Sequence, residues 1–176
     1  RRTGQRYVFS GLWDSYRQYD WSFKCAVGTT TFQGRTYAEN AACLDVLQQF
    51  LRDALKRGSG PELARLSVAV FDWGGTRRGN REWAMGHSGL VGEYRAGEKM
   101  LNPSDYRADD DLKDFDLRFN AGLSKVYSLL LDDFVIYDSR VAAALGWMVV
   151  KYCHAHQLPA VPDTLAFPWS PGREAA

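Results

Sequence analysis

The chain has 176 residues, and this length predicts one domain with a hydrophobic core large enough to fold alone. Lysine and arginine together number 22, and aspartate and glutamate 21. The near-neutral net charge therefore argues against a strongly basic nucleic-acid-binding protein, although it leaves a local basic face open. The aromatic share of 14% is high and predicts either a large aromatic core or surfaces for stacking.

The location that the sequence predicts is the cytoplasm. No apolar run reaches the roughly 18–20 residues of a membrane helix, and the start of the chain lacks the apolar core of a signal peptide. We therefore expect no membrane contact. Cys25, Cys43 and Cys153 are scattered and form no CxxC pair, which favours free thiols in a reducing compartment over a disulfide framework.

The predicted organisation is a single domain over residues 1–176. Residues 1–36 are aromatic-rich and irregular, apart from residues 7–9, which are compatible with a short strand. A helical core is expected over residues 37–156. The four prolines of residues 157–176 predict an extended tail.

The first part of that core is predicted to contain two helices. Residues 37–56 repeat apolar side chains at the helical spacing, and residues 62–73 form a second such pattern that Gly74 and Gly75 end. Pro103 is expected to open a short helix or turn, before an acidic run that ends at Asp116. The expected class is mainly α, with six to eight helices and little strand.

The most informative stretch is a pair of apolar segments at 122–131 and 138–150. Lys125 is the one cation of the first segment, and Asp138 opens the second. Because the break between them is short, we expect the two helices to fold back on each other and to bring Asp138 near the first helix. The spacing leaves open whether Asp138 reaches Lys125.

Each of these two residues has a structural and a chemical interpretation. Asp138 is typical of a helix N-cap, and a carboxylate fixed there can also stabilise a cation or accept a proton. Lys125 can lie at the flank of its helix and extend its amine to water. A buried amine can instead act as a nucleophile that forms a Schiff base.

The segments GLSKV at 122–126 and VIYDSRV at 135–141 resemble the catalytic end of the helix–hairpin–helix DNA glycosylases. By this resemblance Lys125 matches the nucleophilic lysine of the bifunctional members, and Asp138 matches the catalytic aspartate. The resemblance implies cleavage of the N-glycosidic bond of a damaged or modified base that is flipped out of DNA. Asp138 would stabilise the oxocarbenium-like sugar, and Lys125 would attack C1′ where lyase activity follows.

The chain departs from the family pattern at several positions. Residues 120–124 read NAGLS where the family has an L-P-G-x-G hairpin, so one glycine is lost. The distance in sequence from Lys125 to Asp138 is several residues shorter than in the family. Arg140 stands where histidine is common, and Tyr137 stands where the family has a small or aliphatic residue.

DNA is the partner that the resemblance implies, and two groups of residues are candidates to contact it. The hairpin match implies contacts from its own backbone and neighbours, and a glycine-rich loop supplies arginines that either bind phosphates or form a solvated connector. The candidate DNA-contacting residues are Gly122, Ser124, Arg140, Arg77, Arg78 and Arg81. The candidates for stacking on a base are Trp73 and Tyr137, with Trp13, Trp21 and Trp83 as further aromatic residues that can equally belong to the core.

No cofactor and no metal are expected. The sequence Cys153-His154-Ala155-His156 places its two histidines on different faces of a helix, and no second ligand pair is evident. The alternative to an enzyme is a non-catalytic DNA-binding or protein-interaction domain on the same scaffold. A protein partner that binds the aromatic N-terminal segment would require an exposed apolar patch there rather than a cleft.

Overall fold

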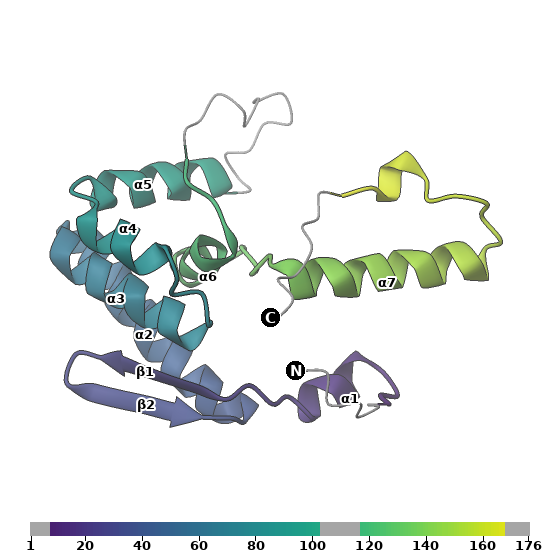
Figure 1. Cartoon of the computed structure of the whole chain (residues 1–176), viewed down its shortest axis with the longest axis horizontal. Coiled ribbons are helices and arrows are strands. Elements are labelled where there is room, and N and C mark those ends of the chain that lie inside the picture. The colour runs from purple at the N-terminus through teal and green to yellow at the C-terminus, as the bar shows by residue number, and fades with distance from the viewer. Residues whose placement is uncertain (1–7, 103–116, 168–176) are drawn as a thin grey trace.

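The computed structural model describes residues 8–102 and 117–167 (Figure 1). The predictions for Pro103, for the acidic run to Asp116 and for residues 168–176 lie outside these residues. The elements in chain order are α1 (Leu12–Arg17), β1 (Phe23–Val27), β2 (Thr30–Gly34), α2 (Tyr37–Arg57), α3 (Gly60–Trp73), α4 (Asn80–Gly86), α5 (Leu90–Leu101), α6 (Ala121–Leu130), α7 (Ser139–Ala155) and a 3-10 helix (Asp163–Leu165). The expectation of a mainly α protein with little strand is therefore confirmed.

Helix α2 begins and ends at residues with clear capping roles. The side chain of Thr36 accepts from the backbone N–H of Glu39, and the Glu39 carboxylate accepts in return from the Thr36 N–H, which forms a capping box. Hydrogen bonds from the backbone N–H groups of Arg35 and Thr36 lower the pKa of Glu39 to about 2. Gly58 ends the helix in the left-handed conformation, with φ of 71°. The predicted range of 37–56 is thus confirmed to within one residue.

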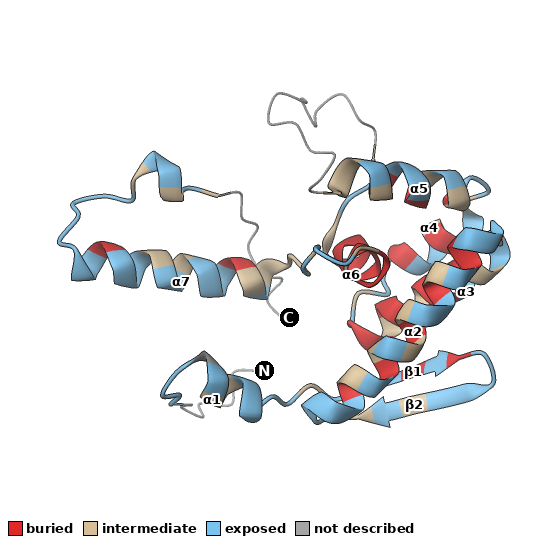
Figure 2. Ribbon diagram, turned by 180° about the vertical axis from the view of Figure 1, so that it is seen from behind, coloured by how far each residue is buried: buried red, intermediate tan, exposed pale blue. Residues whose placement is uncertain are grey.

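Helix α3 is the centre of the helical body. It contacts α2, α4, α5 and α6 as well as strand β1. Pro61 lies in its first turn, where its missing N–H costs no hydrogen bond. Most of its length is buried, with Leu63, Val70 and Phe71 fully enclosed. Figure 2 shows that the buried residues gather in α2, α3 and α6.

The hairpin β1–β2 was not predicted, and the irregular assignment of this part of residues 1–36 is wrong. The strands pair antiparallel from Phe23 opposite Gly34 to Val27 opposite Thr30. In β1 the side chains of Phe23, Cys25 and Val27 are buried and alternate with exposed ones, which is the strand period. Gly28 turns the chain with φ of 61°. The predicted strand at residues 7–9 does not form at positions 8 and 9, the two that the structure describes.

Helix α7 does not fold back along α6, which corrects the expectation from the short break. It projects away from the helical body, and the residues after it return along it (Figure 1). Ala142 and Cys153 are its buried residues, so most of α7 is exposed (Figure 2). The extended chain at 131–138 aims α7 outward instead of reversing it. Within the described ranges, no helix combines the length and the apolar character that crossing a membrane requires.

Candidate lysine–aspartate site

Helix α6 places Lys125 inside the protein. Asn120 caps the helix by accepting hydrogen bonds from the N–H groups of Gly122 and Leu123, at 2.8 and 3.1 Å. The Lys125 side chain is only 4% exposed. Its Nζ donates to the carbonyl oxygen of Ala121 and to Oδ2 of Asp138, both at 3.0 Å. The structure therefore brings together the two residues on which the sequence analysis rests.

Asp138 serves the pair and the helix at the same time. One carboxylate oxygen, Oδ1, accepts from the backbone N–H groups of Arg140 and Val141 at 3.0 and 3.2 Å, and so caps α7. The other oxygen, Oδ2, faces Lys125. Burial alone would raise the pKa of Asp138, but the hydrogen bond and charge of Lys125, together with the two backbone N–H groups, outweigh burial and lower it. Asp138 is thus an ionised carboxylate with both oxygens engaged.

Gly74 leaves the space that the Lys125 side chain occupies. A Cβ built on Gly74 would lie 2.8 Å from Lys125 Cε, even closer to its Cδ, and 3.3 Å from the carbonyl oxygen of Val70. The φ of Gly74 is −85°, which any residue adopts. Close approach, and not backbone conformation, therefore requires glycine here. The sequence predicts that Gly74 ends a helix, but no pattern in the sequence indicates its contact with Lys125.

A network of aromatic and amide groups surrounds the pair on the side of α2 and α3. Asn40 accepts from Trp73 Nε1 at 2.8 Å and donates to the Trp21 carbonyl at 3.1 Å, and Trp21 Nε1 donates to the Trp73 carbonyl at 3.0 Å. The guanidinium of Arg140 lies 4.4 Å from the Trp21 ring centroid and 3.9 Å from Asp138 Oδ2. Asn40 was missed because an asparagine within a helix pattern gives no sign of such partners.

Three residues that the sequence analysis assigned to DNA are buried, and their assignment is corrected. Trp73 is 7% exposed and hydrogen-bonded in the core, so it does not offer a stacking face. Gly122 is buried at the start of α6. Ser124 is fully buried, and its hydroxyl donates to the carbonyls of Ala121 and Tyr137 at 3.2 and 3.1 Å. In this structure none of the three can touch a phosphate or a base.

The segment that would carry the first helix of the hairpin implied by the resemblance lies largely at 103–116, outside the described residues. Residues 117–120 have no helical structure, and the preceding described helix, α5, ends at Leu101. Asn120 is held by Asn80, whose Oδ1 accepts from Asn120 Nδ2 at 3.0 Å. Among the described residues, α4 therefore helps to fix the start of α6.

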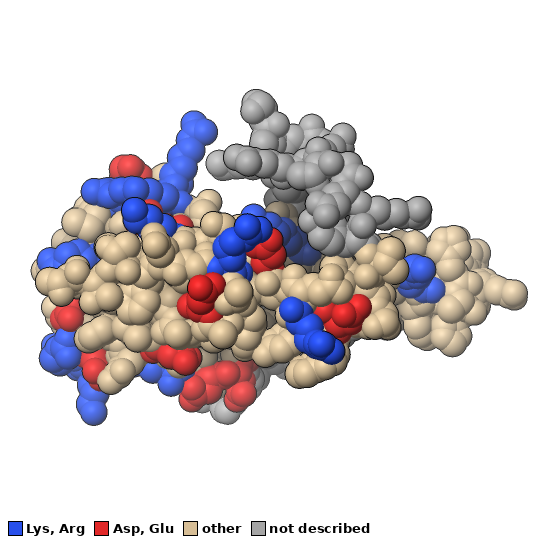
Figure 3. Space-filling model, turned by 90° about the horizontal axis from the view of Figure 1, so that it is seen from below, with Lys and Arg blue, Asp and Glu red and all other residues tan. Residues whose placement is uncertain are grey.

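The three arginines of the predicted glycine-rich loop lie on the surface. Arg77, Arg78 and Arg81 are exposed, and Arg77 Nε lies 3.4 Å from the carboxylate of Asp72. They follow Gly74, the residue that contacts Lys125, and Asn80 connects their loop to α6. The surface is not uniformly basic, since Figure 3 shows cationic and anionic side chains interspersed on the face it presents. Arg140, the fourth arginine that the sequence suggested for DNA contact, is also exposed.

Of the other aromatic residues considered for base stacking, some are exposed at the surface and others contact side chains within the protein. Tyr137 is half-buried and precedes Asp138 in the chain, and its backbone carbonyl accepts a hydrogen bond from the Ser124 hydroxyl at 3.1 Å. Trp83 stacks on His87 with ring centroids 5.2 Å apart and lies under Arg118. Trp13 is 70% exposed and forms the outer end of an aromatic cluster on α1 and α2. The rings of that cluster are Trp13, Tyr16, Tyr19 and Tyr37.

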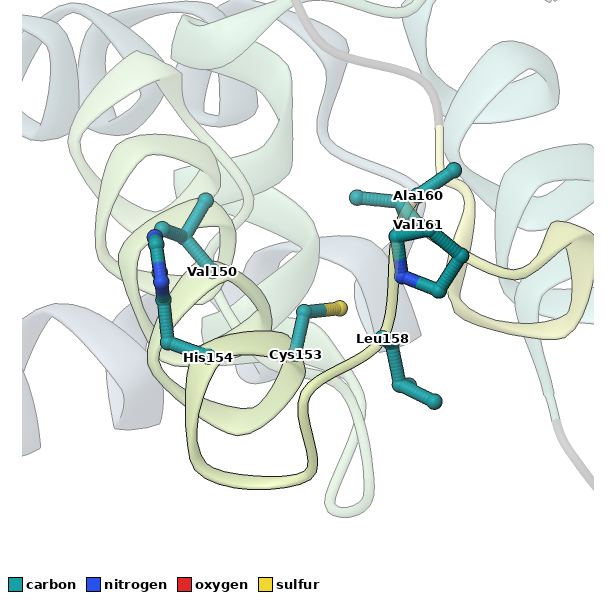
Figure 4. A pocket seen from close by; sticks show the side chains of 7 residues that line it. Val150, Cys153, His154, Leu158, Ala160 and Val161 are labelled. Atoms are coloured by element: carbon teal, nitrogen blue, oxygen red, sulfur yellow. The ribbon is translucent and has the colours of Figure 1, made fainter.

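A small cavity lies away from the lysine–aspartate pair, between α7 and the segment that returns along it (Figure 4). Its volume is about 230 Å³ and its lining is mainly apolar. Cys153 directs its thiol toward Leu158 and Val161 across the cavity. No group of three or more His, Cys, Asp or Glu side chains is placed to hold a metal ion in the part of the chain that the structure describes.

Comparisons of this chain with protein-family models, with curated proteins and with solved structures gave no match.

Proposed function

We propose that the protein is a DNA-glycosylase-like enzyme that cleaves the N-glycosidic bond of a base flipped out of DNA. The observation that carries the proposal is the buried contact of 3.0 Å between Lys125 Nζ and Asp138 Oδ2, at the start of a helix. A nucleophilic amine beside a fixed carboxylate is the arrangement that base excision with lyase activity requires. The match of both residues to the family pattern supports the same assignment.

In the proposed reaction Asp138 acts first by electrostatics. As the base departs, positive charge develops at C1′ of the sugar, and the ionised carboxylate stabilises that charge. The base leaves with the electron pair of the broken bond and takes up a proton from water, and Lys125 gives one proton of its ion pair to Asp138 so that the neutral amine can form a bond to C1′. Opening of the sugar ring gives a Schiff base between C1′ and Nζ. The Asp138 carboxylate is the nearest group that can accept the proton lost by the amine.

The burial of Lys125 adds a requirement to this mechanism. An amine that is 4% exposed cannot meet a sugar unless the elements over it move. Among the described residues, helix α7 makes no extended contact with the helical body. Three features attach it to the body: the chain at 131–138, the contact of Asp138 with Lys125, and Arg140 over the Trp21 ring. Swinging of α7 about Asp138, which stays paired with Lys125, is therefore the motion that would open the pair to a sugar, and the proposed reaction depends on it.

The test is trapping of the Schiff base by borohydride on DNA that contains an abasic site. We expect a covalent adduct with the parent protein and with Lys151→Ala, which removes an exposed lysine on α7, and no adduct with Lys125→Ala. The Lys151→Ala control distinguishes a specific reaction of the Lys125 amine from slow reaction of other lysines. Equal adduct in Lys125→Ala and in the parent would contradict the assignment of Lys125.

Trapping alone would miss an enzyme that uses Asp138 without the lysine. The second assay is release of bases from duplexes that carry different modified bases, comparing the parent with Asp138→Asn. We expect release that falls at least about 100-fold in the variant, because a positioned charge contributes about 3 kcal/mol to such a transition state. No release, no adduct and no salt-sensitive DNA binding would together overturn the proposal.

A second candidate function is supported by the exposed aromatic cluster. Trp13 is 70% exposed on α1, and Trp147 is 62% exposed on α7. Both helices extend to the same side of the helical body (Figures 1 and 2). Such exposure is typical of a surface that binds a protein partner, so a non-catalytic interaction domain is the alternative. A parent protein that forms no adduct with abasic-site DNA, but binds a stable protein partner that Trp13→Ala loses, would favour it.

A further inference from the structure

Two of the three cysteines meet inside the protein, although they are 18 positions apart in the sequence. Cys25 faces inward from strand β1, and Cys43 lies in the second turn of α2. Their sulfur atoms are 3.3 Å apart, and the two residues are 3% and 0% exposed. The third cysteine, Cys153, lies on α7 and lines the cavity described above.

We propose that Cys25 and Cys43 are a modification site at which a peroxide forms an intramolecular disulfide between β1 and α2. The thiolate of Cys25 attacks one oxygen of hydrogen peroxide, and the O–O bond breaks to give a sulfenic acid and water. The thiol of Cys43 then attacks the Cys25 sulfur, the S–O bond breaks, and a second molecule of water leaves. Two thiols are oxidised by two electrons in total, and one peroxide is reduced to two waters.

The geometry makes closure of this bond a small motion. A disulfide has a length of about 2.05 Å, so the two sulfurs need to approach by roughly 1.2 Å. The attacking thiol already lies next to its target, and no other residue needs to leave the space between them. Peroxide is a small oxidant, so it can reach a thiol that is 3% exposed where a bulky disulfide reagent cannot.

The environments of the two sulfurs assign their roles. The hydrogen bond from the Cys43 thiol lowers the pKa of Cys25 and outweighs the opposite effects of burial and of Asp72. For Cys43 the same hydrogen bond and burial both raise the pKa. Cys25 is also the more exposed of the two residues, at 3% against 0% for Cys43, so we assign Cys25 as the sulfur that reacts with the oxidant and Cys43 as the thiol that resolves the sulfenic acid. This ordering agrees with their positions, since Cys25 is on the hairpin and Cys43 is on the buried face of α2.

The inference is independent of any activity at Lys125. The disulfide would close the loop from residue 25 to residue 43 and hold the hairpin on α2. A cross-link of this kind restricts the unfolded chain, so the oxidised protein should have a higher Tm than the reduced protein. In a reducing compartment the bond would form only during exposure to peroxide.

The experiment is peptide mapping of the folded full chain after treatment with hydrogen peroxide. Trypsin cleaves after Lys24, Arg35 and Arg52, which places Cys25 and Cys43 on separate peptides. We expect loss of two hydrogen atoms from the intact mass, and a linked pair of peptides 25–35 and 36–52 that reduction separates. A Cys153→Ala variant is the matched control and should give the same linked pair.

Two further measurements decide the outcome. Cys43→Ala should leave a sulfenic acid on Cys25 that a dimedone-type reagent captures when the peroxide-treated protein is unfolded in its presence, and it should show no linked pair. The oxidised parent should melt at a higher temperature than the reduced parent, whereas Cys43→Ala should show no such rise. Peroxide that leaves both thiols free, or that forms the linked pair only after the protein is unfolded, would overturn the proposal, as would linkage of either cysteine to Cys153.

Discussion

Replacing Asp138 by asparagine tests whether the buried pair exists in solution. Asparagine is as good an N-cap as aspartate, so the hydrogen bonds to the start of α7 can be kept. What the variant removes is the negative charge next to Lys125. The amine then retains the Ala121 carbonyl as its partner but faces a neutral amide in place of a carboxylate. The stability difference between the variant and the parent therefore reports the ion pair rather than the helix cap.

The expected loss is about 3 kcal/mol at pH 7. Breaking a buried ion pair by removing one partner costs about 3–5 kcal/mol, because an uncompensated charge is left in the interior. Here the Asp138 side chain is 13% exposed and the Lys125 side chain 4%. Some water therefore reaches the carboxylate side, and the lower part of that range applies. This figure includes about 0.3–1 kcal/mol for the lost interaction between the carboxylate and the positive end of the α7 helix dipole.

The assay is urea unfolding, followed by circular dichroism at several pH values. Because the pKa of Asp138 is lowered below 3.8 in the folded protein, its contribution is fully present above pH 3.8. The contribution is lost as the pH falls through the folded-state pKa. The difference between the parent and Asp138→Asn should therefore be largest near neutral pH and shrink in acid below pH 3.8.

A matched control is available on the surface. Asp132 forms an ion pair with Arg52 at 2.7 Å, and the two side chains are 84% and 37% exposed. The same chemical change, Asp132→Asn, should cost less than about 1 kcal/mol. If Asp138→Asn costs no more than Asp132→Asn, or if its cost is unchanged after the carboxylate is protonated, the pair does not hold Lys125 as described.

Other substitutions test the packing around the site. Gly74→Ala should destabilise by about 1–3 kcal/mol through overlap with the Lys125 side chain, and Lys125→Ala in the same chain should reduce that cost, as a cycle of urea unfolding curves can show. Tyr127→Phe should be neutral or stabilising because the Tyr127 hydroxyl is buried and has no hydrogen-bond partner among the described residues. Tyr94→Phe instead breaks a bond of 2.6 Å to a serine and should cost about 1 kcal/mol or more in thermal unfolding. Asn40→Ala should cost about 2–4 kcal/mol because it leaves buried indole and carbonyl groups unpaired, with a redder Trp fluorescence as a second measure.

The sequence predicted the long helices well because their signals are local. The apolar spacing of α2 continues for many residues and ends at glycine, so its range could be read directly. The hairpin was missed because β1 has only five residues, and its alternation of Phe23, Cys25 and Val27 lies within a run of irregularly spaced aromatics. The meeting of Cys25 with Cys43 followed from that hairpin, and it could not be predicted without it.

The lysine–aspartate site was predicted in its residues but not in its surroundings. Lys125 and Asp138 were conspicuous because each is a charge beside an apolar segment. The orientation of α7 was not predictable, because the extended chain at 131–138 gives no periodic signal for the direction in which it aims the helix. The contact with Gly74 was hidden for another reason, since it joins residues that are far apart in the sequence and a missing Cβ leaves no pattern.

Asp138 both attaches α7 to the helical body and, in the proposed reaction, takes part in catalysis. A last prediction separates the attachment of α7 from the catalytic step. If α7 must move to expose Lys125, then weakening its other attachment should make that motion easier. Arg140 over Trp21 is such an attachment, and a cation–π contact at an exposed site contributes about 0.5–1 kcal/mol.

With saturating abasic-site DNA, Arg140→Ala should therefore trap the adduct about 2- to 5-fold faster than the parent. Its half-saturating DNA concentration should rise, because an exposed guanidinium that meets phosphate is also lost. An unchanged rate at saturation would mean that opening of α7 does not limit the reaction, and the pair would then have to react in the closed arrangement that buries it.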